Sequence, residues 1–230
     1  MAQTRVLIIE DERALTDVLA YNLQREGYEA ITAHDGQEGL RKAQTLLPDL
    51  ILLDLMLPGL SGFDVCRELR AGERTREIPI IIISAKSEET DQVVGFSLGA
   101  DDYVTKPFSV KVLLQRIKAL QRRADPGAGD ADVVEHLGVR IDRVRHRASA
   151  EGKELDLTPT EFRLLETLLR QPGRAFTRSQ LMDAAIGEGA VVLERTIDVH
   201  VKSLRRKLGR AARLIETVRG VGYRFRETDP

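Results

Sequence analysis

The sequence predicts a doubly wound α/β domain with a five-stranded parallel sheet, followed by a smaller α+β domain. Three observations support this fold class. Short aliphatic runs alternate with amphipathic helical segments five times over residues 4–123. Residues 124–132, ADPGAGDAD, then lack hydrophobic periodicity and are typical of a flexible linker. Beyond them, short strands and three helices replace the βα repeat, so the domains are expected at residues 1–123 and 133–230.

The composition is typical of a soluble globular protein. The chain has 230 residues, of which 42% are hydrophobic and 31% charged, and this length fits one large domain or two ordinary ones. It has neither a segment of membrane-spanning length nor a signal-peptide pattern, so a cytoplasmic location without membrane association is expected. Its single cysteine, Cys66, excludes an internal disulfide framework and lies in a helical pattern that favours a packing role.

The net charge of −1 hides an uneven distribution of charges. Acidic residues are in excess over residues 1–125, whereas Lys and Arg are clearly in excess over residues 136–230. A basic C-terminal half suggests a polyanionic partner, although a charged, solvated surface gives the same pattern.

Each expected strand of the first domain is an aliphatic run, and each expected helix follows a turn or a capping residue. Gly27 should end the first helix in a left-handed C-cap, and Asp35 should cap the second helix. The strands are expected at Val6–Glu10, Glu29–Ala33, Asp49–Asp54, Ile78–Ser84 and Asp102–Thr105. The helices are expected at Ala14–Glu26, Gly36–Leu46, Gly62–Leu69, Glu89–Leu98 and Val110–Arg123.

Polar side chains stand at the ends of four of these strands, namely Glu10, Asp11, Asp54, Ser84 and Lys106. One acid at a strand end is more often a turn or capping residue than a functional group. Right-handed crossovers, however, bring the carboxyl ends of parallel strands to one edge of the sheet, where ligands bind. Three carboxylates in one pocket require a cation, and their oxygens suit Mg²⁺.

This set of groups is suited to phosphoryl transfer. Asp54, beside a metal and Lys106, can attack a phosphoryl group to form an acyl phosphate, while Ser84 donates to a phosphoryl oxygen. A hydrolase that uses the same carboxylates is the alternative. Against it, the domain is small, has no obvious cap over the pocket and offers no dedicated general base near Asp54.

The second domain combines short strands with three helices. Thr158 and Glu161 form a capping-box pattern with Pro159 at the first helical position, and Thr177 should cap the next helix. Strands are expected at Val133–Arg140, Arg143–Ala148 and Glu154–Leu157, helices at residues 159–170, 178–185 and 194–208, and a closing hairpin at Ile215–Arg219 and Gly222–Arg226.

The third helix has an apolar stripe and a basic face, and together with the hairpin this pattern is typical of a winged helix. Such a helix would enter the DNA major groove, and Arg219 on the hairpin would reach the minor groove or its phosphates. A basic helix alone is weak evidence, because most charge runs are solvated faces.

Four motifs in residues 4–123 resemble the receiver domain of bacterial two-component response regulators: IIEDE (Ile8–Glu12), LLDLMLPGLSG (Leu52–Gly62), ISA (Ile83–Ala85) and GADDYVTKPF (Gly99–Phe108). The resemblance implies the strand order 2-1-3-4-5 and makes Asp54 the phosphoacceptor. Asp11 and Asp54 would bind Mg²⁺, with Glu10 assisting and Met56 contributing its backbone carbonyl. Lys106, followed by a cis peptide to Pro107, would pair with the phosphoryl group, and Ser84 and Tyr103 would form the switch pair.

Three further motifs, LTPTEFRLLETLL, RTIDVHVKSLRRKLG and IETVRGVGYRF, resemble the DNA-binding domain of OmpR/PhoB-type regulators. The resemblance then spans nearly the whole chain. It implies a sensor histidine kinase, direct-repeat promoter DNA and RNA polymerase as partners. Phosphate contacts would come from Arg195, Lys202, Arg205 and Arg206, and the residues pointing toward the groove would be Thr196, Asp198, Val199 and Ser203. His200 is expected to orient or pack rather than bind metal.

The resemblance also implies that phosphorylated receiver domains form a homodimer. Its face would include the charged residues Asp101, Asp102, Arg116, Lys118 and Arg123 and the apolar residues Phe96 and Leu114. Gln92 and Val112 replace one usual basic/acidic pair, which predicts a weaker dimer because each exposed pair contributes only about 0–1 kcal/mol. An aspartyl-phosphate phosphatase and a phospho-independent regulator are the competing interpretations.

Overall fold

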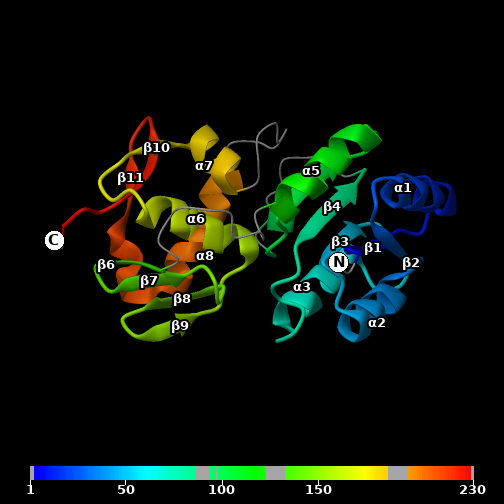
Figure 1. Cartoon of the computed structure of the whole chain (residues 1–230), viewed down its shortest axis with the longest axis horizontal. Coiled ribbons are helices and arrows are strands. Elements are labelled where there is room, and N and C mark those ends of the chain that lie inside the picture. Colours follow the sequence, from blue (N-terminus) through cyan, green and yellow to red (C-terminus); the bar gives the residue numbers. More distant parts are fainter. Residues whose placement is uncertain (1–2, 86–93, 97, 123–132, 186–195, 229–230) are drawn as a thin grey trace. The chain divides into compact units, whose positions relative to one another are not determined.

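The computed structural model describes residues 3–85, 94–96, 98–122, 133–185 and 196–228 (Figure 1). The chain forms two compact units, Met1–Lys118 and Ala119–Pro230. The predicted linker, 124–132, and most of the predicted helix Glu89–Leu98 lie outside the described residues.

The first unit contains the predicted five-stranded parallel sheet, and the predicted strand order, β2-β1-β3-β4-β5, is confirmed. Helices α2 and α3 cover one face of the sheet, and α1 and α5 cover the other (Figure 1). The strands are β1 (Arg5–Ile9), β2 (Glu29–Ala33), β3 (Leu50–Asp54), β4 (Ile80–Ser84) and β5 (Asp102–Thr105). The described helices are α1 (Arg13–Arg25), α2 (Gly36–Leu46), α3 (Gly62–Ala71) and α5 (Val110–Arg122).

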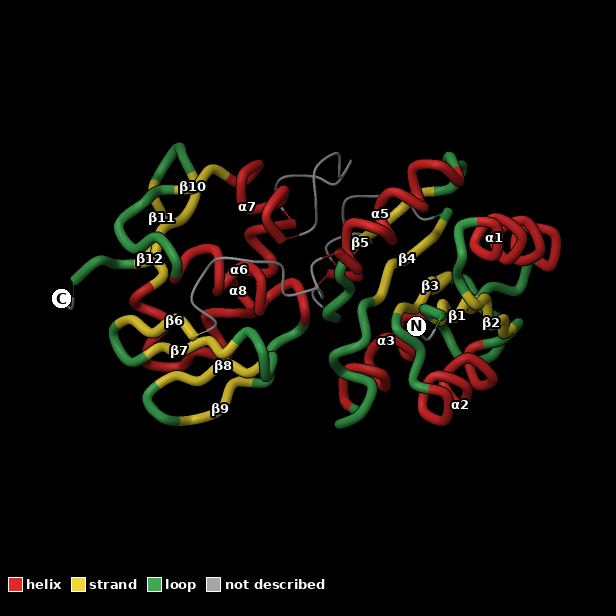
Figure 2. The backbone as a smooth tube through the Cα atoms, viewed as in Figure 1, coloured by secondary structure: helices red, strands yellow, loops and turns green. Residues whose placement is uncertain are grey.

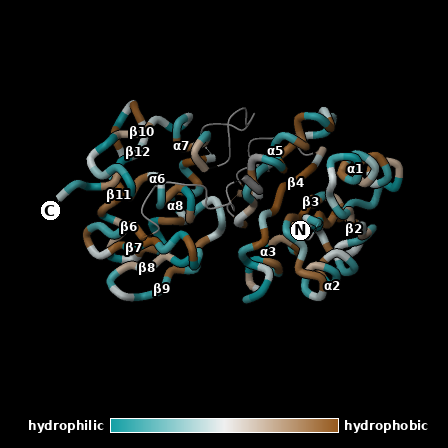
Figure 3. Tube along the Cα trace, viewed as in Figure 1, coloured by the Kyte–Doolittle hydropathy of each residue, from teal (hydrophilic) through white to brown (hydrophobic). Residues whose placement is uncertain are grey.

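The middle of this sheet is the core of the unit. Every residue of β3 and β4 is buried, as expected for strands covered by helices on both faces. Figure 3 shows the same contrast, with mostly hydrophobic strands and helices of mixed hydropathy. Asp54 pairs in register with Ile83 and Ser84 with Thr105, so the polar ends of β3, β4 and β5 lie at one edge.

The predicted helix ends of this unit agree with the structure. The Asp35 side chain accepts a hydrogen bond from the Glu38 backbone amide, 2.7 Å away, and caps α2. Gly27 follows α1 with a φ of 89°, in the left-handed region that glycine adopts without a steric cost.

The second unit holds two antiparallel sheets around a bundle of helices, as Figure 2 shows by its colours. The first sheet comprises β6 (Val133–His136), β7 (Val139–Asp142), β8 (Arg147–Ala150) and β9 (Lys153–Leu155). The second comprises β10 (Phe176–Thr177), β11 (Ile215–Val218) and β12 (Gly222–Phe225). The helices are α6 (Pro159–Leu169), α7 (Arg178–Ala185), α8 (Thr196–Leu208) and the 3₁₀ helix η1 (Gly209–Leu214).

The prediction of one strand over Val133–Arg140 is wrong. Leu137 and Gly138 have φ values of 49° and 75°, so they form a tight turn and divide the segment into β6 and β7. Leucine rarely adopts this conformation, and its aliphatic side chain made the segment look continuous in the sequence. The predicted capping box of α6 is confirmed, because Thr158 and Glu161 exchange side-chain and backbone hydrogen bonds.

Candidate functional site

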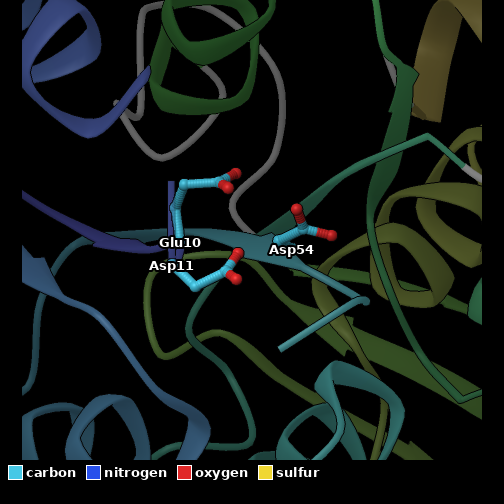
Figure 4. A group of neighbouring side chains, drawn as sticks. All are labelled: Glu10, Asp11 and Asp54. Atoms are coloured by element: carbon cyan, nitrogen blue, oxygen red, sulfur yellow. The ribbon is translucent and has the colours of Figure 1, made fainter. Parts of the chain in front are cut away.

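Three carboxylates meet at the carboxyl edge of the parallel sheet. Glu10 and Asp11 follow β1, and Asp54 is the last residue of β3 (Figure 4). Each offers an oxygen that lies within 4.8 Å of the others. Glu10 and Asp54 are buried, whereas Asp11 is exposed, so the cluster opens to solvent at Asp11.

Lys106 bridges the two buried carboxylates from the end of β5. Its ammonium donates to Glu10 Oε2 at 2.7 Å and to Asp54 Oδ2 at 2.5 Å. Burial raises the pKa of Glu10, and the nearby Asp54 charge adds to this effect, while Lys106 opposes it. Burial alone would lower the pKa of Lys106, but its bonds to Asp54 and Glu10 more than offset burial and raise it. One ammonium therefore holds together a pocket that carries an excess of negative charge.

The backbone after β3 also contacts the Asp54 carboxylate. The Met56 amide donates to Asp54 Oδ1 at 2.8 Å, and the Met56 side chain is exposed. The peptide between Lys106 and Pro107 is cis, as predicted, and the Lys106 amide donates to the Ser84 carbonyl at 2.8 Å. The Met56 amide and the Lys106 ammonium thus each bind one oxygen of the Asp54 carboxylate, and the Lys106 amide joins the ends of β4 and β5.

Ser84 and Tyr103 are both almost fully buried. Ser84 ends β4, and Tyr103 lies on the adjacent strand β5, where its ring contacts that of Phe96 at a centroid distance of 6.3 Å. Displacement of either side chain would therefore change the packing of the unit.

Gly62, the first residue of α3, contributes to the site through its backbone, and the sequence reading did not identify this role. A Cβ atom there would lie 2.0 Å from the Asp54 carbonyl oxygen and 2.6 Å from the Leu55 Cα. The Gly62 amide also donates to the Leu55 carbonyl at 3.1 Å. The start of α3 thus packs directly on the backbone that carries Asp54, which only a residue without a side chain permits.

The donor set of the acidic cluster fits a hard divalent cation. Its three groups are carboxylates, and Mg²⁺ prefers such oxygens while retaining several waters. Among the described residues, this is the single group of three or more His, Cys, Asp or Glu side chains close enough to hold a metal ion.

Four residues of the predicted dimer face are buried in the structure. Asp101 is fully buried and binds Arg70 Nη2 and the Ile80 amide of its own chain, at 2.8 and 2.9 Å. Asp102 is also fully buried, and its carboxylate accepts from Arg116 at 2.6 and 2.7 Å.

Burial raises the pKa of Asp102, while Arg116 opposes this change. The side chains of Asp101, Asp102, Arg116 and Phe96 are therefore interior groups in this structure and not surface contacts. Leu114 is half-buried, and exposed Lys118 pairs with Glu26 of its own chain. Arg123 and Gln92 lie outside the described residues.

Three predicted DNA-binding residues of α8 make contacts within their own unit. Thr196 is buried, with its hydroxyl 3.8 Å from Met182 Sδ, so it does not point toward a groove. Asp198 Oδ1 accepts hydrogen bonds from other side chains of the unit. Arg205 donates to the Ile215 carbonyl at 2.8 Å, so it binds the hairpin of its own chain and is only partly exposed.

The remaining predicted DNA contacts are accessible where they are described. Lys202 and Arg206 are exposed on α8, and Arg219 is exposed at the turn between β11 and β12. Val199 and Ser203 are partly exposed, whereas Arg195 lies outside the described residues. His200 is buried.

Arg178 and Tyr223 are functional candidates that the sequence reading missed. Arg178 begins α7 and donates to Asp198 Oδ1, and the Tyr223 hydroxyl on β12 donates to the same oxygen. No local sequence signal links these residues, because the three come from different elements of the unit.

No helix within the described residues is long and apolar enough to span a membrane.

Two family models match the chain. Residues 6–118 match the response regulator receiver domain, and residues 152–225 match the C-terminal domain of transcriptional regulatory proteins. In overall fold the chain is similar to a solved mutant of RitR, with a TM-score of 0.76 and 28% identity. That match covers 98% of this chain and all of the other. It is also similar to the response regulator DrrB of Thermotoga maritima, with a TM-score of 0.53, 27% identity and the same coverage.

Curated relatives match almost from end to end. The phosphate regulon transcriptional regulatory protein PhoB of Rhizobium meliloti is 46% identical over 225 residues, which are 95% of this chain and 97% of the relative. PhoB of Escherichia coli is 41% identical over 223 residues, 96% of this chain and 97% of the relative. The sensory transduction protein RegX3 of Mycolicibacterium smegmatis is 46% identical over 229 residues, 96% and 99% of the two chains. The chain therefore belongs to the PhoB-type response regulators, transcription factors that combine a receiver domain with a DNA-binding domain.

Proposed function

We propose that Asp54 is the residue that accepts the phosphoryl group in this response regulator. The observation that carries the proposal is the Asp54 carboxylate itself, buried beside two further carboxylates and bonded to Lys106. A receiver domain implies a histidine kinase as partner, and phosphorylation-dependent activation is typical of the family. An Asp54 oxygen would attack the phosphorus as the bond between phosphorus and the donor breaks, giving an acyl phosphate.

Glu10, Asp11, Asp54 and the Met56 backbone carbonyl would hold Mg²⁺, which when bound neutralises the carboxylates and the charge of the transferred group. Lys106 would exchange its bond to Asp54 for one to a phosphoryl oxygen. The Ser84 hydroxyl would move inward and donate to another phosphoryl oxygen. The Tyr103 ring would follow this movement. Because the Ser84 and Tyr103 side chains are buried, phosphorylation of Asp54 would change the packing of the receiver domain.

Acetyl phosphate with Mg²⁺ tests this chemistry. Intact-mass analysis should show one phosphate adduct on the full chain, and Asp54→Asn should abolish it. Asp17→Asn is the matched control, because Asp17 is an exposed acid on α1. A wild-type chain that gains no adduct, or an Asp54→Asn chain that still gains one, contradicts the proposal.

Two further assays, phosphomonoester turnover and DNA binding, separate the regulator from the two alternatives. Multiple turnover on small phosphomonoesters, faster than the decay of the Asp54 adduct, would favour a phosphatase. DNA binding that is identical with and without the adduct would favour a phospho-independent regulator.

We further propose that Lys202, Arg206 and Arg219 are the described cations that contact promoter DNA. They are supported by their exposure on α8 and on the hairpin turn. Each contact with a phosphate should contribute about 0.9 to the slope of log K against log salt. Alanine at each position should reduce that slope by about one, whereas Lys153→Ala, an exposed cation on β9, should leave it unchanged.

Phosphorylation would promote a homodimer, in the cytoplasm, that binds direct-repeat DNA and contacts RNA polymerase. With four predicted residues buried, the described positions that remain for the dimer face are Leu114, Val112 and Lys118. Leu114→Glu should then prevent the increase in molecular mass that phosphorylated wild-type chain shows in sedimentation. An unchanged increase would place the dimer face elsewhere.

A further inference from the structure

Four side chains tie α8 to the hairpin β11–β12, and we refer to Arg178, Asp198, Arg205 and Tyr223 as the helix–hairpin clamp. Asp198 Oδ1 accepts a hydrogen bond from Arg178 Nε at 2.8 Å and a second from the Tyr223 hydroxyl at 2.7 Å. One carboxylate oxygen on α8 is thus bound by the start of α7 and by β12.

Arg205 makes a second connection between α8 and the hairpin. Its Nη2 donates to the Ile215 carbonyl at 2.8 Å and to Thr217 Oγ1 at 2.9 Å, both on β11. The guanidinium carbons of Arg205 and Arg178 each lie 5.4 Å from the centroid of the Tyr223 ring, within the range of cation–π attraction. The clamp therefore contacts both strands of the hairpin.

The Tyr223 hydroxyl remains a hydrogen-bond donor to Asp198 at neutral pH. Burial, and then its bond to Asp198, raise the pKa of Tyr223 to about 12, so the phenol stays protonated in the neutral range. Hydrogen bonds to a charged acceptor are also stronger than those between neutral groups.

Backbone pairing joins the hairpin to the segment before α7 over only a short distance. Strand β10, which pairs with β12, has two residues, Phe176 and Thr177. The described cations proposed to contact DNA lie on both sides of the clamp, Lys202 and Arg206 on α8 and Arg219 on the hairpin turn. A duplex can meet all three at once only if α8 and the hairpin keep one relative orientation.

We propose that the helix–hairpin clamp sets the hairpin turn relative to α8, so that Arg219 reaches the same duplex that α8 contacts. Tyr223, Asp198, Arg178 and Arg205 are then positioning residues, and they act on DNA through Arg219. The inference rests on the proposed contact between Arg219 and DNA.

Tyr223→Phe tests the clamp, because it removes one hydroxyl, keeps the ring and changes no charge. The probe is a duplex that the wild-type full chain selects from a random-sequence pool, and its affinity is measured between about 50 and 200 mM salt. The variant should bind roughly five- to tenfold more weakly at about 100 mM salt, and the slope of log K against log salt should fall by about one. Tyr21→Phe, on the exposed face of α1, is the matched control and should bind as wild type does.

A double-mutant cycle with Arg219→Ala separates positioning from direct contact. If the clamp positions Arg219, then Arg219→Ala alone lowers the slope by about one, and adding Tyr223→Phe lowers it no further. Additive losses would mean that Tyr223 contacts DNA itself, and they would overturn the inference. A wild-type slope for Tyr223→Phe, with a lowered slope for Arg219→Ala, would overturn the clamp while leaving the DNA contact intact.

Two further results complete the test. If Arg219→Ala keeps the wild-type slope, the proposed DNA contact fails, and the clamp fails with it. If Tyr223→Phe loses its circular-dichroism signal at the assay temperature, Thr217→Val decides instead, because it removes an acceptor of Arg205 at an exposed site without a change of charge. An unchanged slope in Thr217→Val would then overturn the proposal.

Discussion

Gly62→Ala should slow phosphorylation of Asp54 without a change in any group that reacts. The added Cβ would lie 2.0 Å from the Asp54 carbonyl oxygen, whereas Cβ atoms essentially never approach closer than 3.0 Å. Both atoms in conflict, the Asp54 carbonyl oxygen and the Leu55 Cα, belong to the backbone, so no side chain can rotate to relieve the clash. The end of β3 and the start of α3 must therefore separate by about 1 Å, and a shift of that size at a reacting group can cost about 10²-fold in rate.

The assay is the initial rate of adduct formation on the full chain with acetyl phosphate and Mg²⁺, followed by intact mass. We expect Gly62→Ala to react about ten- to a hundredfold more slowly. Overpacking should also reduce the free energy of unfolding by about 1–3 kcal/mol. The comparison of rates is valid at a temperature where circular dichroism shows both proteins to be folded.

Gly59→Ala is the matched control, because it makes the same chemical change three positions earlier in the loop after β3. Gly59 has a φ of 75° with no atom within 4 Å of an added Cβ, so alanine there is strained but does not collide. It should reduce stability by about 1–2 kcal/mol and keep the wild-type rate. If folded Gly62→Ala reacts as fast as Gly59→Ala, the packing of α3 does not position Asp54 and the reasoning is refuted.

Three other measurements follow from the structure. Glu10→Gln should raise the Tm of the metal-free chain at neutral pH, since a raised pKa means that burial disfavours the charged form, yet it should weaken Mg²⁺ binding by about tenfold in a fluorescence titration. The Tyr223 phenol should ionise near pH 12 in an absorbance titration at alkaline pH, and its contribution to stability, complete below about pH 10, should be lost as the pH rises toward 12. Ionisation of all tyrosines near pH 10 would contradict that environment. Arg70→Met should reduce the free energy of unfolding by about 3–5 kcal/mol in urea, because Asp101 would keep a buried charge, and a loss under about 1 kcal/mol would contradict it.

The receiver fold could be predicted from sequence because its signals are local. Aliphatic runs mark the buried strands, and the handedness of parallel crossovers then places Glu10, Asp54 and Lys106 at one edge without any knowledge of side-chain geometry. The structure adds what these rules do not contain, namely the two bonds that Lys106 makes to Glu10 and Asp54. The close approach of Gly62 was also beyond the sequence, because it depends on how two backbone segments pack.

Long-range pairs between charged side chains could not be predicted from the sequence. Asp101 and Asp102 are adjacent in the sequence, which suggests a shared surface, yet each is buried against a different arginine, Arg70 or Arg116. Those partners lie on α3 and α5, and no local periodicity connects them to β5. Leu137 is a different kind of error, because a leucine in the left-handed region has no sequence signature.

Contacts within the domain also divide the cations of α8 into two functional groups. In sequence, Lys202, Arg205, Arg206 and Lys207 form one basic face. In the structure Arg205 is bound to the hairpin, and Lys207 donates to the buried Glu161 carboxylate at 2.6 Å. Their charges are used within the domain, so removal of either should act first on the fold. Because counterion release depends on charges that reach phosphate, the electrostatic part of DNA affinity should depend on Lys202 and Arg206, and on Arg219 only as far as the clamp holds the hairpin in place.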